Sequence, residues 1–187
     1  MAQAGPTNRV TTGGFTYSTA GIIQFDELDI DRLISAGRFD EVILHEMAHV
    51  MGFGTLWEAN NVYDNGTGEY TGAAGVAAYQ AEFDPTASFV PVELDGGPGT
   101  ENSHWDEAWA GGSDALMTGF LSLSPSSSEP FLSETTIQSF ADLGFEVRAV
   151  DSGPDHDLLT TVPLPAGGFL LLSALGGLLW PRRRAGA

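Results

Sequence analysis

Apolar residues recur every three or four positions in several segments of the chain, and this spacing places them on one face of an α-helix. The segment 41–51 is strongly apolar and contains neither glycine nor proline. Gly52 follows it, and a glycine just past the last turn can end a helix in the left-handed conformation. Helices are therefore predicted at 26–36, from about 38–40 to 51, at 73–83 and at 133–143.

Residues suited to helix ends flank these segments. Gly37 follows the first predicted helix. Asp40 is expected to cap the second, because a carboxylate is favourable at a helix N-terminus. Ser133 and Gly144 are predicted to begin and end the last helix. Three apolar residues are predicted to form the buried face of that helix: Ile137, Phe140 and Leu143.

The N-terminal region and one later stretch favour strands. Residues 11–21, rich in threonine, glycine and aromatic side chains, predict a short hairpin, and 22–25 predict a strand after it. Residues 89–94 predict a further strand, beyond a glycine-rich and polar loop at 60–75. Residues 1–10 lack the basic start and apolar core of a secretory signal. Short strands together with helices predict an α+β fold.

Length and composition fit one globular domain, predicted at 1–150, because 187 residues with 42% hydrophobic content can bury a sizeable core. Three of the seven basic residues are the arginines at 182–184. The rest of the chain has four arginines and 25 acidic residues, so its net charge is −21. This charge argues against nucleic acid as a partner, because phosphate binding needs cationic patches. Four acidic loop residues could bind Ca²⁺, although solvated charge is the favoured interpretation: Asp64, Glu69, Asp95 and Glu101.

The segment 45–49, His-Glu-Met-Ala-His, carries the strongest chemical signal. On a helix, His45 and His49 lie one turn apart on the same face, so their imidazoles can converge on one point. Zn²⁺ accepts neutral imidazole nitrogens and, in catalytic sites, keeps one position open for water. Glu46 is placed to take the proton of that water. An ordinary surface pair is the alternative, but apolar flanks predict burial, and burying two unpartnered histidines is costly.

Such a zinc site needs a third ligand, and two further histidines are available. In metzincin peptidases the motif continues to a histidine three residues after the glycine, but that position is Thr55 here, which is not a ligand. His156 lies in a polar stretch near the C-terminal tail, with nothing to fix it against a rigid site. His104, followed by Trp105 and an acidic pair, is the better candidate.

Three separated segments, at 45–52, 102–107 and 115–119, carry a resemblance to a known family. A delayed His-Trp-acidic segment followed by Leu-Met-Thr-Gly resembles the leishmanolysin-like peptidases, metzincins with a long insertion before the third histidine. The resemblance extends from Phe25 to Phe145. It implies a metzincin-like zincin catalytic domain with an active-site helix, a small mixed sheet, a Met-turn and a C-terminal helix. Only 44 residues precede the first histidine, so the N-terminal subdomain would be shortened and an upstream segment missing.

The resemblance also implies roles for particular residues. Residues 118–121 would line the pocket for the substrate residue that follows the cleaved bond. The zinc ligands would be His45, His49 and His104. Glu46 would be the general base, and Met117 would belong to the Met-turn beneath the metal.

The predicted function is that of a zinc-dependent metalloendopeptidase acting on proteins or peptides, with a zinc-bound water as nucleophile and Glu46 as general base. Two alternatives remain open. The chain could be a metal-binding adhesion module without catalysis, or a peptidase whose third ligand is Glu82. Three tyrosines could supply a second oxyanion donor, and spacing favours none of them: Tyr63, Tyr70 and Tyr79.

The C-terminal stretch differs in kind from the rest. After a linker at 151–165, residues 166–184 are predicted to form a hydrophobic transmembrane or sorting helix with a basic end, which would keep the body outside the cytoplasm. Residues 162–166 resemble the Val-Pro-Leu-Pro-Ala type of bacterial sorting signal, whose tail a membrane protease removes after export. The protein is therefore expected to be exported, with at least a transient membrane contact. An ordinary hydrophobic anchor is the alternative.

Overall fold

The computed structural model divides the chain into two units, Met1–Arg148 and Ala149–Ala187. The structure describes residues 2–123 and 130–148, all of which belong to the first unit. The predicted linker and hydrophobic helix at 151–184 lie outside the described residues. Within the part that is described, no helix is both long and apolar enough to cross a membrane.

A long hairpin forms the N-terminal part of the first unit. The strands β1 (Ala2–Thr12) and β2 (Phe15–Phe25) pair antiparallel, with a register shift near Asn8. Gly13 and Gly14 connect them and have φ values of 60° and 89°, which a two-residue hairpin turn requires and glycine adopts without strain. The prediction of a hairpin confined to 11–21 was wrong. The first half of β1 has few strand-forming residues, and its pairing with β2 makes it a strand.

The helix α1 (Glu27–Ala36) follows β2 and agrees with the predicted helix at 26–36. Its N-terminal cap is Asp26, whose carboxylate accepts a hydrogen bond from the Leu28 amide at 3.0 Å. Gly37 ends α1 with a φ of 65°, and Leu33 is the helix residue that is fully buried. The sequence therefore predicted both the helix and its two ends.

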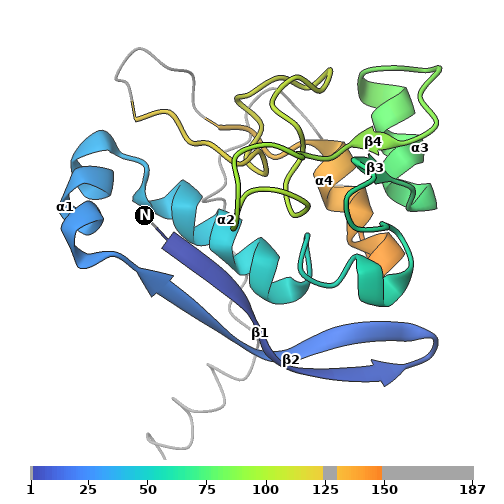
Figure 1. Ribbon diagram of the computed structural model, residues 1–187, viewed down its shortest axis with the longest axis horizontal. Coiled ribbons are helices and arrows are strands. Elements are labelled where there is room, and N and C mark those ends of the chain that lie inside the picture. The colour runs from blue at the N-terminus through green and yellow to red at the C-terminus, as the bar shows by residue number, and fades with distance from the viewer. Residues whose placement is uncertain (1, 124–129, 149–187) are drawn as a thin grey trace, which may run out of the picture. The chain divides into compact units, whose positions relative to one another are not determined.

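The helix α2 (Phe39–Met51) contains the His-Glu-Met-Ala-His segment and runs beside the hairpin (Figure 1). It ends at Gly52, where φ is 126°, as predicted. The predicted cap was wrong, because Asp40 lies inside the first turn and the cap position is Arg38, which makes no side-chain capping bond. The left-handed turn at Gly37 directs the chain so that α2 already begins at Phe39.

The rest of the unit combines helices with very short strands. The helix α3 (Ala73–Glu82) was predicted, whereas the expected strand at 89–94 is reduced to β4 (Val90–Pro91), which pairs with β3 (Glu69–Tyr70). Pro91 has no amide hydrogen to extend the ladder. Single turns of 3-10 helix occur at η1 (Glu58–Asn60) and η2 (Ala141–Leu143). Two small two-stranded sheets and four α-helices confirm the α+β class among the described residues.

The last α-helix, α4 (Glu134–Ser139), has the predicted cap: Ser133 Oγ accepts a hydrogen bond from the Thr136 amide at 3.1 Å. Gly144 ends η2 with a φ of 88°. The predicted buried face was wrong in part, because Leu143 is buried but Ile137 and Phe140 are only partly so. The helix instead buries hydroxyl residues whose side chains form hydrogen bonds: Thr135, Thr136 and Ser139.

An aromatic core joins the end of α2 to the segment at 102–107. The ring of Trp105 is fully buried, with its centroid 5.0 Å from that of Phe53 and 5.1 Å from that of Trp57. Its indole nitrogen donates a hydrogen bond to Thr136 Oγ1 at 2.9 Å. Phe53 and Trp57 follow α2 directly, so burial of these rings fixes the residue next to Trp105, which is His104, against the helix.

Candidate metal centre

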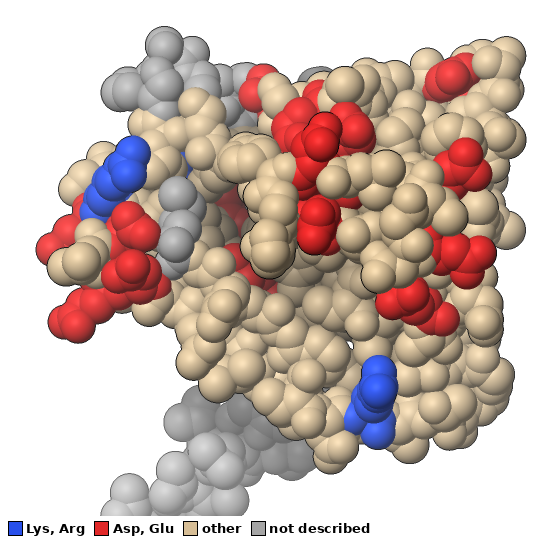
Figure 2. All heavy atoms as spheres, in the orientation of Figure 1, with Lys and Arg blue, Asp and Glu red and all other residues tan. Residues whose placement is uncertain are grey.

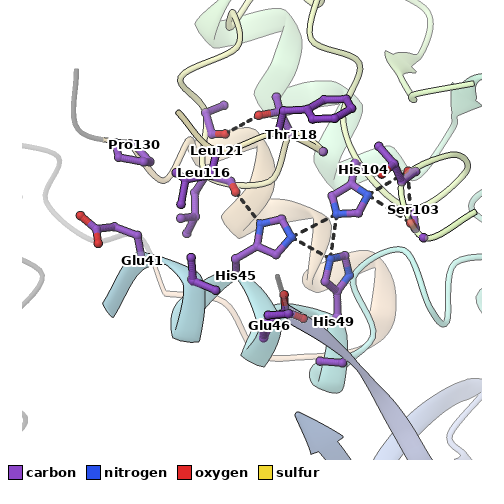
Figure 3. Close-up of a pocket in the computed structure, with 18 of the residues that line it drawn as sticks. Glu41, His45, Glu46, His49, Ser103, His104, Leu116, Thr118, Leu121 and Pro130 are labelled. Atoms are coloured by element: carbon purple, nitrogen blue, oxygen red, sulfur yellow. Dashed lines mark hydrogen bonds between the residues drawn. The ribbon is translucent and has the colours of Figure 1, made fainter. Parts of the chain in front are cut away.

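Three histidines meet at one point in the described part of the chain (Figure 3). His45 and His49 extend from the same face of α2, and His104 comes from the loop before Trp105. The three Nε2 atoms form a nearly equilateral triangle with sides of 3.0, 3.0 and 3.1 Å. The structure thus brings His104 to the helix pair across 55 positions of sequence, whereas His156 lies outside the described residues.

The second nitrogen of each ring contacts a main-chain carbonyl oxygen. Because a carbonyl can only accept a hydrogen bond, each Nδ1 carries the proton and each neutral ring leaves its Nε2 unprotonated. Nδ1 of His104 also lies 3.1 Å from Ser103 Oγ. The three carbonyl contacts are His45 with Leu116 at 2.7 Å, His49 with Phe53 at 3.0 Å, and His104 with Thr100 at 2.9 Å.

The unprotonated Nε2 atoms fit a metal ion. Three lone pairs face one another with no hydrogen atom between them, and a cation removes the resulting repulsion. Tetrahedral ligands about 2.0–2.1 Å from zinc lie roughly 3.3–3.4 Å apart, close to the separations of the Nε2 atoms. No other group of three or more histidine, cysteine or acidic side chains in the described ranges could hold a metal ion, and the four acidic residues considered for Ca²⁺ do not form one.

Burial keeps the three imidazoles neutral. Loss of solvation lowers the pKa of His45 and, together with the charges that neighbouring imidazoles would carry, lowers the pKa of His49 well below its ordinary value. The same two causes lower the pKa of His104 to about 4. Since only a neutral imidazole binds a metal, all three rings are in the binding form at neutral pH.

Glu46 lies on α2 between the two helix histidines and lines the same cavity (Figure 3). Its side chain is buried, and loss of solvation raises the pKa of the carboxyl group to about 7. A carboxyl group with this pKa can accept and release a proton near neutral pH. The arrangement can therefore bind a metal ion and transfer a proton beside it.

Two main-chain contacts fix the position of the third histidine. The Trp105 amide donates to the carbonyl oxygen of Met117 at 2.9 Å. Gly54, with a φ of 69°, passes so close to the Ser103 backbone that any side chain on it would overlap that residue. Met117 is fully buried and occupies the turn in which the Thr118 amide donates to the Ala115 carbonyl oxygen at 3.2 Å.

The three histidines lie in a cavity of about 650 Å³. One wall comes from residues 2–4 of β1, and another from residues 118–122, which include the predicted pocket segment 118–121. None of the three candidate tyrosines is among the described residues that line this cavity. Their hydroxyl groups bond elsewhere: Tyr63 to Asn102, Tyr70 to Asp142, and Tyr79 to the Ala110 amide.

The alternative third ligand, Glu82, lies at a different place. Its Oε1 accepts a hydrogen bond from the Glu134 amide at 2.8 Å, and its Oε2 accepts bonds from the Thr135 amide and hydroxyl at 2.6 and 2.5 Å. The carboxylate therefore satisfies the free amides at the start of α4 and does not join the histidines.

Sequence reasoning missed several residues of the site. The carbonyl oxygens that orient the rings have no sequence signal, because any residue can supply one. The lining residues Ala2–Ala4 were missed together with the first half of β1. Glu41 also lines the cavity, and here a signal existed: it precedes His45 by four positions, which places it on the same face of α2.

Buried neutral imidazoles from a helix and a distant loop, with a glutamate beside them, are typical of a metal-dependent hydrolase. The family model of leishmanolysin matches residues 17–151. The chain therefore belongs to the leishmanolysin family, which is a family of zinc metallopeptidases. No curated protein and no solved structure matches the chain significantly.

Proposed function

We propose that this chain is a zinc-dependent endopeptidase in which His45, His49 and His104 bind the metal. One observation supports this proposal most directly: three unprotonated Nε2 atoms lie within 3.1 Å of one another, inside a cavity open to a substrate. Membership in a metallopeptidase family supports the reaction type. Met117 would lie in the turn beneath the metal, and its fully buried side chain would anchor that turn in the core.

Glu46 is proposed to be the general base. Zinc, when bound, would lower the pKa of a water molecule to about 7 and polarise the substrate carbonyl group. Glu46 would accept a proton from water in the cavity and then donate it to the amine that leaves. Its burial in the cavity wall and its raised pKa suit a group that exchanges a proton in both directions.

The first strand is proposed to position the substrate. Among the described residues β1 pairs only with β2, and Ala2, Gln3 and Ala4 of β1 line the cavity. The free amide and carbonyl groups of an edge strand can pair with an extended peptide. A peptide aligned in this way would pass the histidines with its main chain fixed, which favours cleavage within a chain over cleavage at its ends.

The location of the protein remains a proposal from the sequence. Residues 162–184 combine a Val-Pro-Leu-Pro-Ala segment, an apolar run and three arginines, which supports export followed by sorting or anchoring at a membrane. A sorting protease is the proposed partner in that case. Comparison of the mature C-terminus with the encoded one by mass spectrometry would distinguish a removed tail from a retained anchor.

The decisive experiment combines metal analysis with one substitution. The purified protein should contain one zinc ion per chain, and a chelator should abolish cleavage of an unfolded protein substrate. Glu46→Ala should retain zinc and reduce kcat/KM by about 10²–10⁴-fold, the range attributed to a general base. The exposed Glu58, changed to alanine, is the matched control. Cleavage by Glu46→Ala at the wild-type rate would refute the role of Glu46, and cleavage resistant to chelation would refute the role of zinc.

A further inference from the structure

Glu93 and Glu107 form a pair of acidic side chains behind the wall of the cavity. Figure 2 shows many acidic side chains on the surface, where water solvates them, but Glu93 is only 4% exposed and Glu107 is half-buried. Neither is among the described residues that line the cavity. Their two carboxyl groups share a hydrogen bond, and because a carboxylate can only accept, that bond requires one proton between them.

The pair connects the wall of the cavity to the loop that carries the third histidine. Glu107 Oε1 accepts a hydrogen bond from the Gly119 amide at 3.0 Å, and Gly119 belongs to the segment 118–121, which lines the cavity. Glu93 is fixed at the other end, because its amide donates to the His104 carbonyl oxygen at 3.0 Å. The two side chains therefore join two stretches of main chain that flank the same cavity.

The segment 118–121 also packs closely against this loop. A Cβ atom on Gly119 would lie 2.2 Å from Thr100 Cγ2, so only glycine fits at this position. The carbonyl oxygen of Thr100 contacts Nδ1 of His104 at 2.9 Å. Phe120, the next residue along the wall, lines the cavity and is 60% exposed. The hydrogen bond to Glu107 thus holds the wall at the point where it meets the support of the third histidine.

We propose that Glu107, paired with Glu93, is a positioning residue that fixes the segment 118–121 and thereby shapes the wall against which the substrate binds. This inference rests on the proposed function, because the wall has this role only if a substrate occupies the cavity. A contribution to stability alone would leave substrate affinity unchanged in a folded variant, and this difference makes the two roles distinguishable.

Hydrogen exchange of the Gly119 amide tests the bond itself. In Glu107→Ala the amide loses its acceptor, so its exchange with D₂O, measured by NMR, should be at least about tenfold faster than in the wild type. Glu107→Gln should keep slow exchange, because its carboxamide can accept from Gly119 and donate to Glu93. The Trp105 amide, bonded to Met117, is the internal reference. Equal exchange of Gly119 in wild type and Glu107→Ala, or fast exchange in Glu107→Gln, would overturn the inference.

Steady-state kinetics with casein as substrate test the effect on binding. Glu107→Ala should raise KM by about three- to tenfold and change kcat by less than about twofold, whereas Glu107→Gln should keep the wild-type KM. Glu82→Ala is the matched control, because it also removes a carboxylate that accepts main-chain hydrogen bonds but lies outside the cavity lining. Thermal unfolding and zinc content establish that each variant is folded. An unchanged KM in folded Glu107→Ala, or an equal increase in Glu82→Ala, would contradict the positioning role.

A binding measurement separates this inference from the proposed function. Fluorophore-labelled casein is titrated with Glu46→Ala protein and with the double variant Glu46→Ala/Glu107→Ala, and the affinities are obtained from fluorescence anisotropy. Binding that is about three- to tenfold weaker in the double variant supports the inference even if the wild type hydrolyses no casein, a result that would contradict only the peptidase assignment. Equal affinity of the two variants, or binding by neither, would refute the role of Glu107.

Discussion

At the scale of single residues, the candidate metal centre depends on which nitrogen of each imidazole carries the proton. Leu116, Phe53 and Thr100 each present a carbonyl oxygen to an Nδ1 atom, and this leaves all three Nε2 atoms available to one cation. The helical spacing of His45 and His49 was predictable from the sequence. The contacts of the rings with carbonyl oxygens were not predictable. They depend on the course of the backbone over the 4 positions from His49 to Phe53 and the 71 positions from His45 to Leu116.

Replacing the distant ligand should remove the metal while leaving the fold. His104→Ala is expected to lower zinc affinity by at least about tenfold, because two ligands on one helix cannot complete a tetrahedral site. His156→Ala is the matched control and should bind zinc normally. Isothermal titration with zinc measures both affinities. Unchanged affinity in His104→Ala would contradict its assignment as a ligand.

Acid should release zinc only well below neutral pH. Burial lowers the pKa of each histidine, to about 4 for His104, so protons compete with zinc at lower pH than they would for an exposed imidazole with a pKa of about 6.5. Zinc content measured after dialysis should therefore stay constant from pH 7 to about 6 and fall as the pH approaches 4. Release that is already half complete at about pH 6.5 would show that the rings are not protected by burial.

At the scale of elements, α2 supplies most of the chemistry. Glu41, His45 and His49 follow one another at intervals of one turn on the face toward the cavity, and Glu46 lies beside them. The sequence predicted α1, α2 and α3 well because apolar spacing and glycine caps are local signals. It did not predict the length of β1 or the reduction of β4 to two residues, because pairing partners determine strands.

The capping of α4 by Glu82 leads to a prediction that also tests the alternative ligand. Glu82→Ala removes the acceptor for two main-chain amides and one hydroxyl, so the free energy of unfolding should fall by about 1–3 kcal/mol. Zinc content of the folded variant should not change. Glu69→Ala, at an exposed position in β3, should change stability by less than about 0.5 kcal/mol. Urea unfolding measures both; loss of zinc from folded Glu82→Ala would favour Glu82 as a ligand.

At the scale of the whole molecule, the candidate metal centre joins two parts of the chain that are distant in sequence. The buried rings of Phe53, Trp57 and Trp105 bring the loop with His104 against α2. Tertiary packing of this kind has no local sequence signal, and His104 was predicted from the small number of histidines and from the family resemblance. The acidic composition was visible from the start, but which of the acidic side chains line the cavity depends on the fold.

Close packing at Gly54 provides a test of this long-range assembly. Gly54→Ala would place a methyl group against the Ser103 backbone, next to His104, and should lower both zinc affinity and the unfolding temperature. Gly66→Ala is the matched control, because Gly66 also has a positive φ, 82°, but no atom lies within 4 Å of the added carbon. The free energy of unfolding of Gly66→Ala should fall only by about 1–2 kcal/mol, which is the cost of alanine in the left-handed conformation, and its zinc affinity should not change. Equal zinc affinity in the two variants would show that this contact does not position His104.

The carbonyl contacts of the three imidazoles have a consequence for how such a centre can change over evolutionary time. Its outer support is made of peptide groups, which every amino acid possesses, so mutation of a supporting position exchanges the side chain without deleting the acceptor. Distant descendants can therefore diverge at Leu116 and Thr100 while inheriting the same ligand orientation, provided that the backbone keeps its course. Insertions or deletions in these two loops, rather than replacements, are the genetic changes to which the centre is most vulnerable.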